Sequence, residues 1–267
     1  MMMSEALNVV VCIKQVPETT EVEFDEETGR LKREGVAAVI NPFDEYAVEE
    51  GLKLKERFGG VVKVISMGPP QAESALRETI ALGCDEAWLA TDRAFAGADT
   101  WVTSYTLGLC IEKIAPYDII VCGLKTTDGD TGQVGPELAQ HLGLPHVCYV
   151  NGILDVSGGR IRLTRAVDDG VETLEALLPV VITVTKEINQ PRLATLRGRL
   201  RARKAEIRQI TSKDIDAPPG SLGLDGSPTR VVEIFTPTPP AAGDVYSGTP
   251  EELAERILEK LVECKVV

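Results

Sequence analysis

Short apolar runs and segments with helical spacing alternate along the first 150 residues. Apolar runs of strand length occupy residues 8–14, 61–67, 86–90, 117–122 and 145–150. Apolar residues three and four apart fill the stretches between them, near residues 44–58, 75–81, 99–114 and 134–142. This alternation predicts parallel βαβ units with right-handed crossovers. The expected fold is α/β, with a Rossmann-like parallel sheet and flanking helices.

The segment between the first strand and the first helix has a different pattern. Residues 21–25 alternate as a strand does, and residues 30–33 offer a hairpin partner after a turn at 27–29. Asp44 is the expected N-cap of the first helix, and Gly59 and Gly60 are expected to end it.

The pattern changes again after Asn151. Residues 160–165 and 171–175 alternate with period two around Asp168, Asp169 and Gly170, which predicts a β-hairpin. Residues 179–185 read as a buried strand. We therefore expect one α/β domain over residues 1–235, with a hairpin insertion at 160–176; the adenine-nucleotide site assigned to it rests on the resemblance given below.

An extended C-terminal arm follows this domain. Residues 236–240 (TPTPP) are linker-like, and residues 251–264 form an amphipathic closing helix that begins at Thr249 and Pro250. We expect residues 236–267 to form a separate linker and helix, which packs either on its own domain or on a partner chain.

Composition narrows the class of protein. The chain has 267 residues, 43% of them hydrophobic but only 4% aromatic, so an aliphatic core is expected. Six scattered cysteines without a CxxC pair indicate thiols in a reducing compartment, and two histidines do not supply a metal centre or catalytic triad. No apolar run approaches the ~20 residues of a membrane span, and the first residues lack a basic leader. These features predict a cytoplasmic protein.

Charge is distributed unevenly. The net charge of −13 argues against a nucleic-acid partner. Residues 192–208 nevertheless hold seven basic residues and one acid, which leaves −19 on the remainder. This segment is either a basic arm that steers an acidic partner or a solvated charged strand.

The stretch from residue 121 to residue 136 (VCGLKTTDGDTGQVGP) joins the fourth strand to a helix. Its glycines permit close approach of backbone N–H groups to a ligand, and the helix start adds donors that favour a phosphate. Asp128 and Asp130 would repel phosphate unless they cap loop N–H groups or accept from ribose hydroxyls, which leaves Lys125 and Thr131 to face the phosphates. The loop matches neither GxxxxGK[ST] nor GxGxxG. A ligand-free Asp/Gly-rich turn therefore stays an alternative to a nucleotide site.

Parallel sheets bind ligands beyond the carboxyl ends of their strands. Here those ends are residues 12–14, 66–68 and 122–123. We expect the three segments to meet at one crevice beside the glycine-rich loop.

Several segments together resemble the β subunit of electron-transfer flavoproteins, over essentially the whole chain. They are VCIKQVP (11–17), NPFD (41–44) with YAVEE (46–50), MGPP (67–70), DGDTGQVGP (128–136), VDDG (167–170), LPVVIT (178–183) and PRLATL (191–196). The resemblance implies a heterodimer with an α subunit that carries one FAD. It also implies a second adenine nucleotide in this chain, which is AMP in the familiar type and FAD in the electron-bifurcating type.

The glycine-rich loop favours the second type. Loops of the AMP type are typically longer and read DDDCNQTGQM, whereas this chain has DGDTGQVGP, with Gly132 where alanine is commoner. A shorter loop of small residues leaves more room for the flavin end of a dinucleotide. The resemblance then implies NADH as electron donor, a flavin-dependent dehydrogenase or oxidoreductase of the acyl-CoA type as partner, and a low-potential acceptor such as ferredoxin or flavodoxin. AMP remains the alternative ligand.

The resemblance also places residues by position. The cofactor would be bound by Cys12, Asn41, Phe43, Asp44, Met67, Gly123, Lys125, Thr126, Asp128, Gly129, Asp130, Thr131, Gly132, Gln133 and Val134. Leu196 and Arg197 lie in a segment, about residues 190–204, that resembles the loop by which the family recognises partner dehydrogenases. No catalytic residue and no metal ligand is implied.

Two functions of other classes compete with this interpretation. A nucleotide-hydrolysing synthetase would place an SGGxDS-like loop after the first strand, where this chain has Gln15, Val16, Pro17 and Glu18. A nucleotide-binding regulator without redox activity would show no flavin reduction by NADH.

Overall fold

A computed structural model describes residues 6–18, 38–233, 243 and 245–267. The chain divides into two compact units, Met1–Arg230 and Val231–Val267. The expected hairpin over residues 21–33 lies outside the described residues. No described helix is long and apolar enough to cross a membrane.

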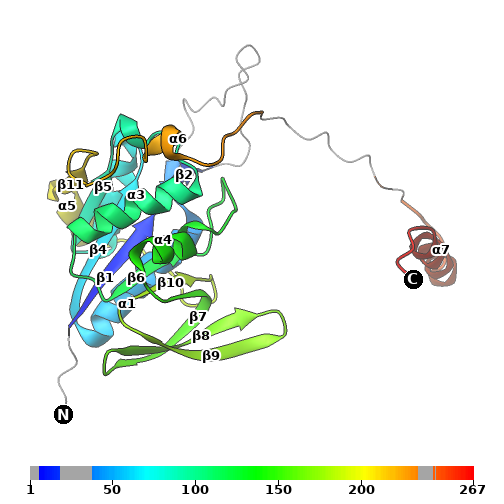
Figure 1. Cartoon of the computed structure of the whole chain (residues 1–267). Helices are drawn as coiled ribbons and strands as arrows, with labels where there is room; N and C mark the ends of the chain where they lie inside the picture. Colours follow the sequence, from blue (N-terminus) through cyan, green and yellow to red (C-terminus); the bar gives the residue numbers. More distant parts are fainter. Residues whose placement is uncertain (1–5, 19–37, 234–242, 244) are drawn as a thin grey trace. The chain divides into compact units, whose positions relative to one another are not determined.

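The first unit is built on one nine-stranded sheet with the order β11-β5-β4-β1-β6-β10-β7-β8-β9 (Figure 1). Its strands are β1 Leu7–Ile13, β4 Gly60–Met67, β5 Glu86–Ala90, β6 Ile119–Gly123, β7 His146–Ser157, β8 Arg160–Val167, β9 Gly170–Leu177, β10 Val180–Val184 and β11 Ile207–Ile210. Pairing is parallel from β11 to β7 and antiparallel from β7 to β9. A small antiparallel pair, β2 Gln15–Pro17 and β3 Ala38–Ile40, stands apart. The α/β class and the parallel sheet are confirmed.

Helices cover both faces of the parallel part. They are α1 Pro42–Phe58, α2 Glu73–Leu82, α3 Thr100–Lys113, α4 Val134–Leu142 and α5 Leu196–Lys204, with the short turns η1 Pro70–Ala72, η2 Arg93–Phe95 and α6 Gly223–Gly226. Helices α1, α2 and α5 pack on one face, while α3 and α4 pack on the other (Figure 1).

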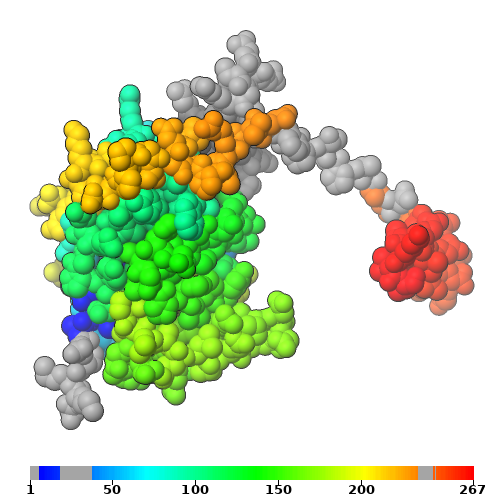
Figure 2. Space-filling view, viewed as in Figure 1, coloured from blue at the N-terminus to red at the C-terminus, as the bar shows by residue number. Residues whose placement is uncertain are grey.

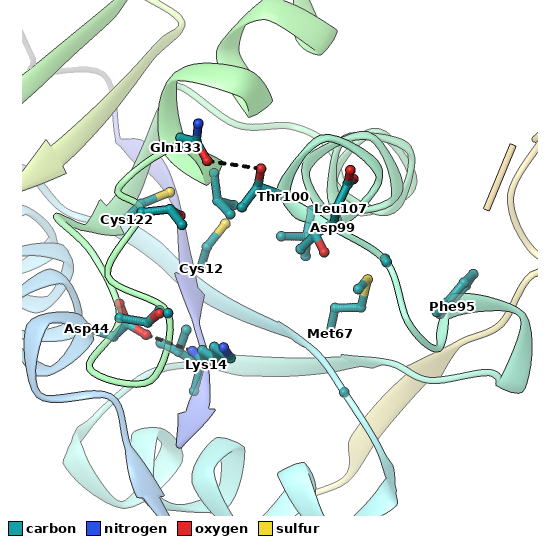
Figure 3. Close-up of a pocket in the computed structure, with 18 of the residues that line it drawn as sticks. Cys12, Lys14, Asp44, Met67, Phe95, Asp99, Thr100, Leu107, Cys122 and Gln133 are labelled. Atoms are coloured by element: carbon teal, nitrogen blue, oxygen red, sulfur yellow. Dashed lines mark hydrogen bonds between the residues drawn. The ribbon is translucent and has the colours of Figure 1, made fainter. Parts of the chain in front are cut away.

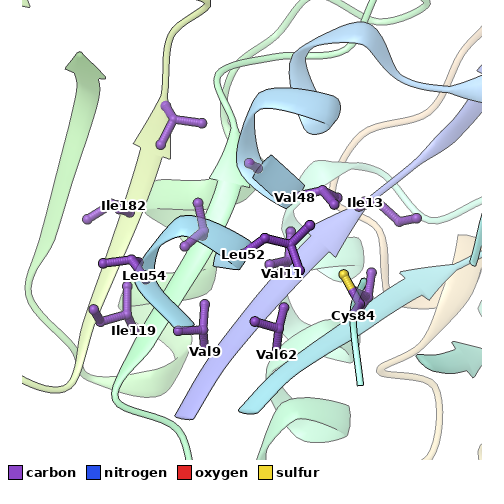
Figure 4. Packing of buried hydrophobic residues seen from close by; sticks show 14 of the residues in the cluster. Val9, Val11, Ile13, Val48, Leu52, Leu54, Val62, Cys84, Ile119 and Ile182 are labelled. Carbon is purple, nitrogen blue, oxygen red and sulfur yellow. The ribbon is translucent and has the colours of Figure 1, made fainter. Parts of the chain in front are cut away.

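Strand β1 explains why the core has two layers. Successive side chains of a strand point to opposite faces, so Val9 and Val11 enter the layer under α1 (Figure 4). Val10 and Cys12 enter the layer under α3 and α4. All four are buried. Each buried valine contributes roughly 1.5–3 kcal/mol. The uninterrupted apolar run of the sequence is thus the consequence of a strand covered on both sides.

Apart from the expected hairpin at residues 21–33, which lies outside the described residues, the strands and helices expected up to residue 150 are present, with one correction. Asn41, and not Asp44, is the N-cap residue of α1, and Pro42 takes the first helical position. Proline suits that position because its missing N–H has no partner there in any helix. Asp44 lies within the first turn and is buried.

The strand expected at residues 145–150 is β7, and it is longer than expected. It runs from His146 to Ser157 and pairs with β10 at its start and with β8 further on. The expected hairpin forms β8 and β9, and the space-filling view shows it projecting from one end of the unit (Figure 2).

The basic segment is a helix, α5, followed by strand β11, so the expectation of a charged strand or loop was wrong for residues 196–204. Thr195 caps α5 by accepting from Gly198 N–H at 3.0 Å. A β-carbon on Gly198 would lie 2.0 Å from Ala81 O, so α5 and α2 touch along their backbones. Arg201 donates to Ile80 O in the last turn of α2 and to Cys84 O just after the helix, and Arg77 donates to carbonyls at the end of α5. Tertiary packing therefore decides the conformation of this charged segment.

The second unit contains α7, Pro250–Glu263. Thr249 and Glu252 form a capping box at its start, as the Thr-Pro pair predicts. Ile257 and Leu258 are exposed on this unit.

Candidate functional site

The carboxyl ends of β1, β4, β5 and β6 meet at a cavity of about 750 Å³ (Figure 3). The three strand ends expected to converge do so. The predicted residues that line the cavity are Cys12, Asp44, Met67, Gly123, Lys125, Thr126, Gly129, Thr131, Gly132, Gln133 and Val134. Because β1 lies between β4 and β6, the cavity is at the point where the strand order reverses, the usual ligand site of such sheets.

Asn41 supports the glycine-rich loop and does not line the cavity. Its side-chain Nδ2 donates to Lys125 O at 2.9 Å, and Thr127 N–H donates to its Oδ1 at 3.2 Å. The residue is fully buried. The side-chain amide of Asn41 therefore ties the glycine-rich loop, at Lys125 and Thr127, to the start of α1.

Asp44 ties together the ends of two strands. Lys14 N–H donates to its Oδ2 at 2.7 Å, and a β-carbon on Gly123 would lie 2.2 Å from its Oδ1. Glycine at position 123 therefore makes room for the Asp44 carboxyl and not only for a ligand. Burial raises the pKa of Asp44 to about 7, although hydrogen bonds from Lys14 N–H and Asn41 act in the opposite direction.

The two loop aspartates pair with lysines. Lys14 Nζ lies 2.7 Å from Asp128 Oδ2, and Lys125 Nζ lies 2.7 Å from Asp130 Oδ1. Neither aspartate lines the cavity, and their contacts with a ribose stay a prediction. These side chains are at least one-third exposed, and such pairs contribute about 1 kcal/mol or less. Lys125 also lies over the Phe43 ring at 5.6 Å, and Phe43 does not line the cavity either.

The start of α4 provides the donors expected for an anion. Gln133 is its N-cap residue and, in the part of the chain that the structure describes, no side chain caps this helix start. Gln133, Val134 and Gly135 all line the cavity. Gly132, just before them, has φ of 64°, a conformation that side chains with a β-carbon rarely adopt. Uncapped N–H groups and the helix dipole favour a phosphate at this end.

The opposite wall of the cavity comes from a segment that the sequence analysis missed. Most residues of the connection from β5 to α3, Thr91 to Asp99, line it together with Thr100, Thr103 and Leu107 of α3. The sequence could have predicted this wall, because Ala90 ends a predicted parallel strand and the carboxyl ends of such strands meet at one edge of the sheet. Met67, Phe95 and Leu107 are large apolar side chains on this side of the cavity, which we call the apolar wall (Figure 3). Asp92, Arg93 and Asp99 line the same side.

The floor between the two ends consists of thiols. Cys12 and Cys122 are register partners on β1 and β6, and both are buried (Figure 3). A hydrogen bond with Cys12 and burial hold the pKa of Cys122 well above its usual range. The thiol of Cys122 is therefore neutral at physiological pH and presents a compact, weakly polar surface to a ligand.

Comparison with known proteins identifies the family. Residues 28–215 match the model of the electron transfer flavoprotein domain. The "Electron transfer flavoprotein subunit beta" of Thermoanaerobacterium thermosaccharolyticum is 46% identical over 256 residues, which cover 96% of this chain and 98% of that protein. The chain belongs to the electron transfer flavoprotein β-subunit family.

Two further relatives bear other names. The "Caffeyl-CoA reductase-Etf complex subunit CarD" of Acetobacterium woodii is 41% identical over 263 residues, which cover 98% of this chain and 100% of that protein. "Protein FixA" of Azotobacter vinelandii is 41% identical over 266 residues, which cover 96% of this chain and 94% of that protein. Electron transfer as the β subunit, together with an α subunit, is the function that the family membership supports.

The predicted partner-binding residues lie away from the cavity, at the start of α5. Leu196 is 76% exposed and Leu193 is 91% exposed, and Arg197 beside them is exposed as well. Arg192 anchors this segment to α1 through Glu49 and Glu56. The apolar side chains therefore project from a firmly held base.

Proposed function

We propose that this β subunit binds FAD in the cavity and takes part in flavin-based electron bifurcation, in which NADH is oxidised and its electrons pass to a partner dehydrogenase and to a low-potential acceptor such as ferredoxin or flavodoxin. The observation that carries the proposal is the extent of the cavity. Its volume of about 750 Å³ lies in the upper part of the ~300–1,000 Å³ range of small-molecule sites. It joins a phosphate-binding end to an apolar end.

The residues present fit a dinucleotide. The N–H groups at the start of α4 and the loop at Gly132 suit a diphosphate, and Met67, Phe95 and Leu107 suit an aromatic ring system. Bound FAD would supply both two-electron and one-electron redox chemistry. The chain's own part is to orient the ligand, to exclude water with the apolar wall, and to present the neutral thiol of Cys122.

The partners follow from the family and from exposed surfaces. The name of the Acetobacterium woodii relative places that protein in a complex with a reductase, which supports a flavin-dependent dehydrogenase as partner here. Leu196 and Arg197 form the docking site for it, and residues 236–267 pack on the α subunit. Four of the six cysteines are buried and unpaired, which favours a reducing compartment such as the cytoplasm.

Nucleotide content tests the cofactor. The chain is co-expressed with its α subunit, and FAD and AMP are quantified after denaturation. Two FAD per heterodimer are expected, together with anaerobic bleaching of flavin absorbance by NADH. One FAD with one AMP, and no bleaching, would refute bifurcation and make the cavity a structural AMP site.

Leu196→Ala tests the docking site. Electron transfer to the partner dehydrogenase should slow by about 30-fold, because one buried leucine contributes roughly 2 kcal/mol to a contact. Nucleotide content should not change. Leu154→Ala, on a half-exposed leucine of β7, is the matched control. Loss of nucleotide in Leu196→Ala would contradict the assignment.

A further inference from the structure

Residues 221–230, which we call the strap, lie against the segment that forms the apolar wall. Leu224 N–H donates to Ala96 O at 3.0 Å. A β-carbon on Gly223 would lie 2.3 Å from Ala94 O, and one on Gly97 would lie 3.1 Å from Leu224 Cβ. The strap and the wall therefore touch along their backbones, so a displacement of one displaces the other.

Asp99 joins the strap to the start of α3. Its Oδ1 accepts from Val102 N–H at 3.1 Å, which caps the helix. Its Oδ2 accepts from the N–H and the hydroxyl of Thr229, at 3.0 and 2.7 Å. Its own N–H donates to Ser227 Oγ at 2.9 Å. Asp99 thus caps α3 and also binds the strap; we call its hydrogen bonds with Ser227 and Thr229 the latch.

The other end of the wall is held in a similar way. Asp92 Oδ2 accepts from the N–H and hydroxyl of Ser212, at 3.0 and 2.6 Å. The hydroxyl of Ser212 and the N–H of Ala94 lower the pKa of Asp92 to about 2. The hydrogen bonds of Asp92 and Asp99 are made to residues that do not line the cavity. They therefore hold the wall in place without a ligand.

We propose that the latch formed by Asp99, Ser227 and Thr229 positions the apolar wall and thereby makes the cavity select a dinucleotide over a mononucleotide. The inference rests on the proposed function. A mononucleotide needs only one part of the cavity: the start of α4 and the glycine-rich loop would hold its phosphate, and its ring would lie beside Cys12. The second ring of a dinucleotide needs the wall, and a wall that had to be ordered on binding would weaken the complex.

Asp99→Asn separates the latch from the helix cap. Asparagine is as good an N-cap as aspartate, so the bond from Val102 is kept. Its amide nitrogen would face the N–H of Thr229, so that bond is lost and the latch is weakened, while the bond from the N–H of residue 99 to Ser227 Oγ remains. Ser227→Ala/Thr229→Ala removes the two hydroxyls of the latch and leaves the bond from the N–H of residue 229, at residues that do not line the cavity. Asp214→Asn is the matched control, because Asp214 accepts from the N–H and hydroxyl of Thr211 but lies outside the cavity.

The measurement is the Kd of FAD and of AMP for the nucleotide-stripped heterodimer, well below its melting temperature. We expect both latch variants to bind FAD about five- to tenfold more weakly, the effect of one or two hydrogen bonds, and AMP within about twofold of wild type. Asp214→Asn should bind both normally. Unchanged FAD affinity in both latch variants, or equal losses of FAD and AMP, would overturn the inference. A wild type that binds only AMP would instead refute the proposed function, before any variant is compared.

Discussion

Two helices begin at the same cavity, and they begin differently. The N-terminus of α3 is closed by the carboxyl group of Asp99, whereas α4 begins at Gln133 with no side-chain cap from the described residues. Hydrogen bonds to Val102 and Thr229 outweigh burial and lower the pKa of Asp99, so α3 presents a negative charge to the cavity. Of these two helix starts, only α4 is therefore suited to a phosphate.

Thr100 connects the two helix starts. Its hydroxyl lies 3.3 Å from Gln133 Oε1 (Figure 3) and 3.2 Å from Glu137 Oε1. The closed terminus thus helps to position the open one. The capped start of α3 thus stabilises the fold, whereas the uncapped start of α4 has N–H groups left for a ligand.

The first prediction extends the comparison to α1, whose start holds the buried carboxyl group of Asp44. A folded-state pKa raised from 3.8 to about 7 means that Asp44 contributes stability below pH 4 and loses it as the pH rises to 7. Asp44→Asn should therefore gain stability relative to wild type over this range, by up to about 4 kcal/mol at pH 8. Chemical denaturation at several pH values measures it.

Asp92→Asn is the control for that pH profile. The pKa of Asp92 is lowered to about 2, so its contribution should be lost only as the pH falls below 4. Equal stability differences for Asp44→Asn at pH 4 and pH 8 would contradict a raised pKa.

The second prediction closes the open helix start. Gln133→Asp places a carboxylate at the N-cap of α4, as on α3, and should weaken nucleotide binding by about 30-fold through repulsion and competition for the N–H groups. Gln133→Asn makes a similar change without the charge and should cost less than fivefold. Titration of the stripped heterodimer with nucleotide measures both. If the two variants bound equally, the phosphate would lie elsewhere.

The third prediction concerns the glycine before α4. Gly132 and Gly143 flank the same helix and share a φ of 64°, but only Gly132 lines the cavity. Each change to alanine should destabilise the protein by about 1 kcal/mol, because alanine is strained at positive φ. Nucleotide affinity should fall about tenfold in Gly132→Ala alone. Parallel losses of affinity in both variants would indicate a general effect of stability.

The smallest effect is expected at the lysine that pairs with the loop. Lys14→Met removes the ion pair with Asp128 and should weaken nucleotide binding two- to threefold at low salt and hardly at all at high salt. Lys55→Met, which breaks the pair with Asp85 outside the cavity, is the control. An effect that persisted in high salt would indicate a direct contact of Lys14 with the ligand.

Much of the fold was readable because its signals are local. The run of β-branched residues in β1, the glycine after α1 and the Thr-Pro start of α7 each depend on neighbours in sequence, and all appear where expected. The site was readable in outline, because strand ends of a parallel sheet meet at one edge.

Contacts between distant segments were not readable. Asn41 and Asp44 were both expected at the cofactor, and the structure shows in addition that they hold the glycine-rich loop and the end of β1. The ion pairs of Asp128 and Asp130 with Lys14 and Lys125 were not expected either. The charged segment at 196–204 is helical because α2 packs against it.

By itself, the sequence determined the order of strands and helices, their apolar faces and the position of the glycine-rich loop, since each follows from periodicity and local backbone preference. Only the tertiary structure decided that the loop between β5 and α3 forms the second wall, that Asp99 closes one helix start, and that α4 stays open. Hydrogen bonds between residues more than a hundred positions apart, such as Thr229 to Asp99, leave no periodic trace in a single sequence.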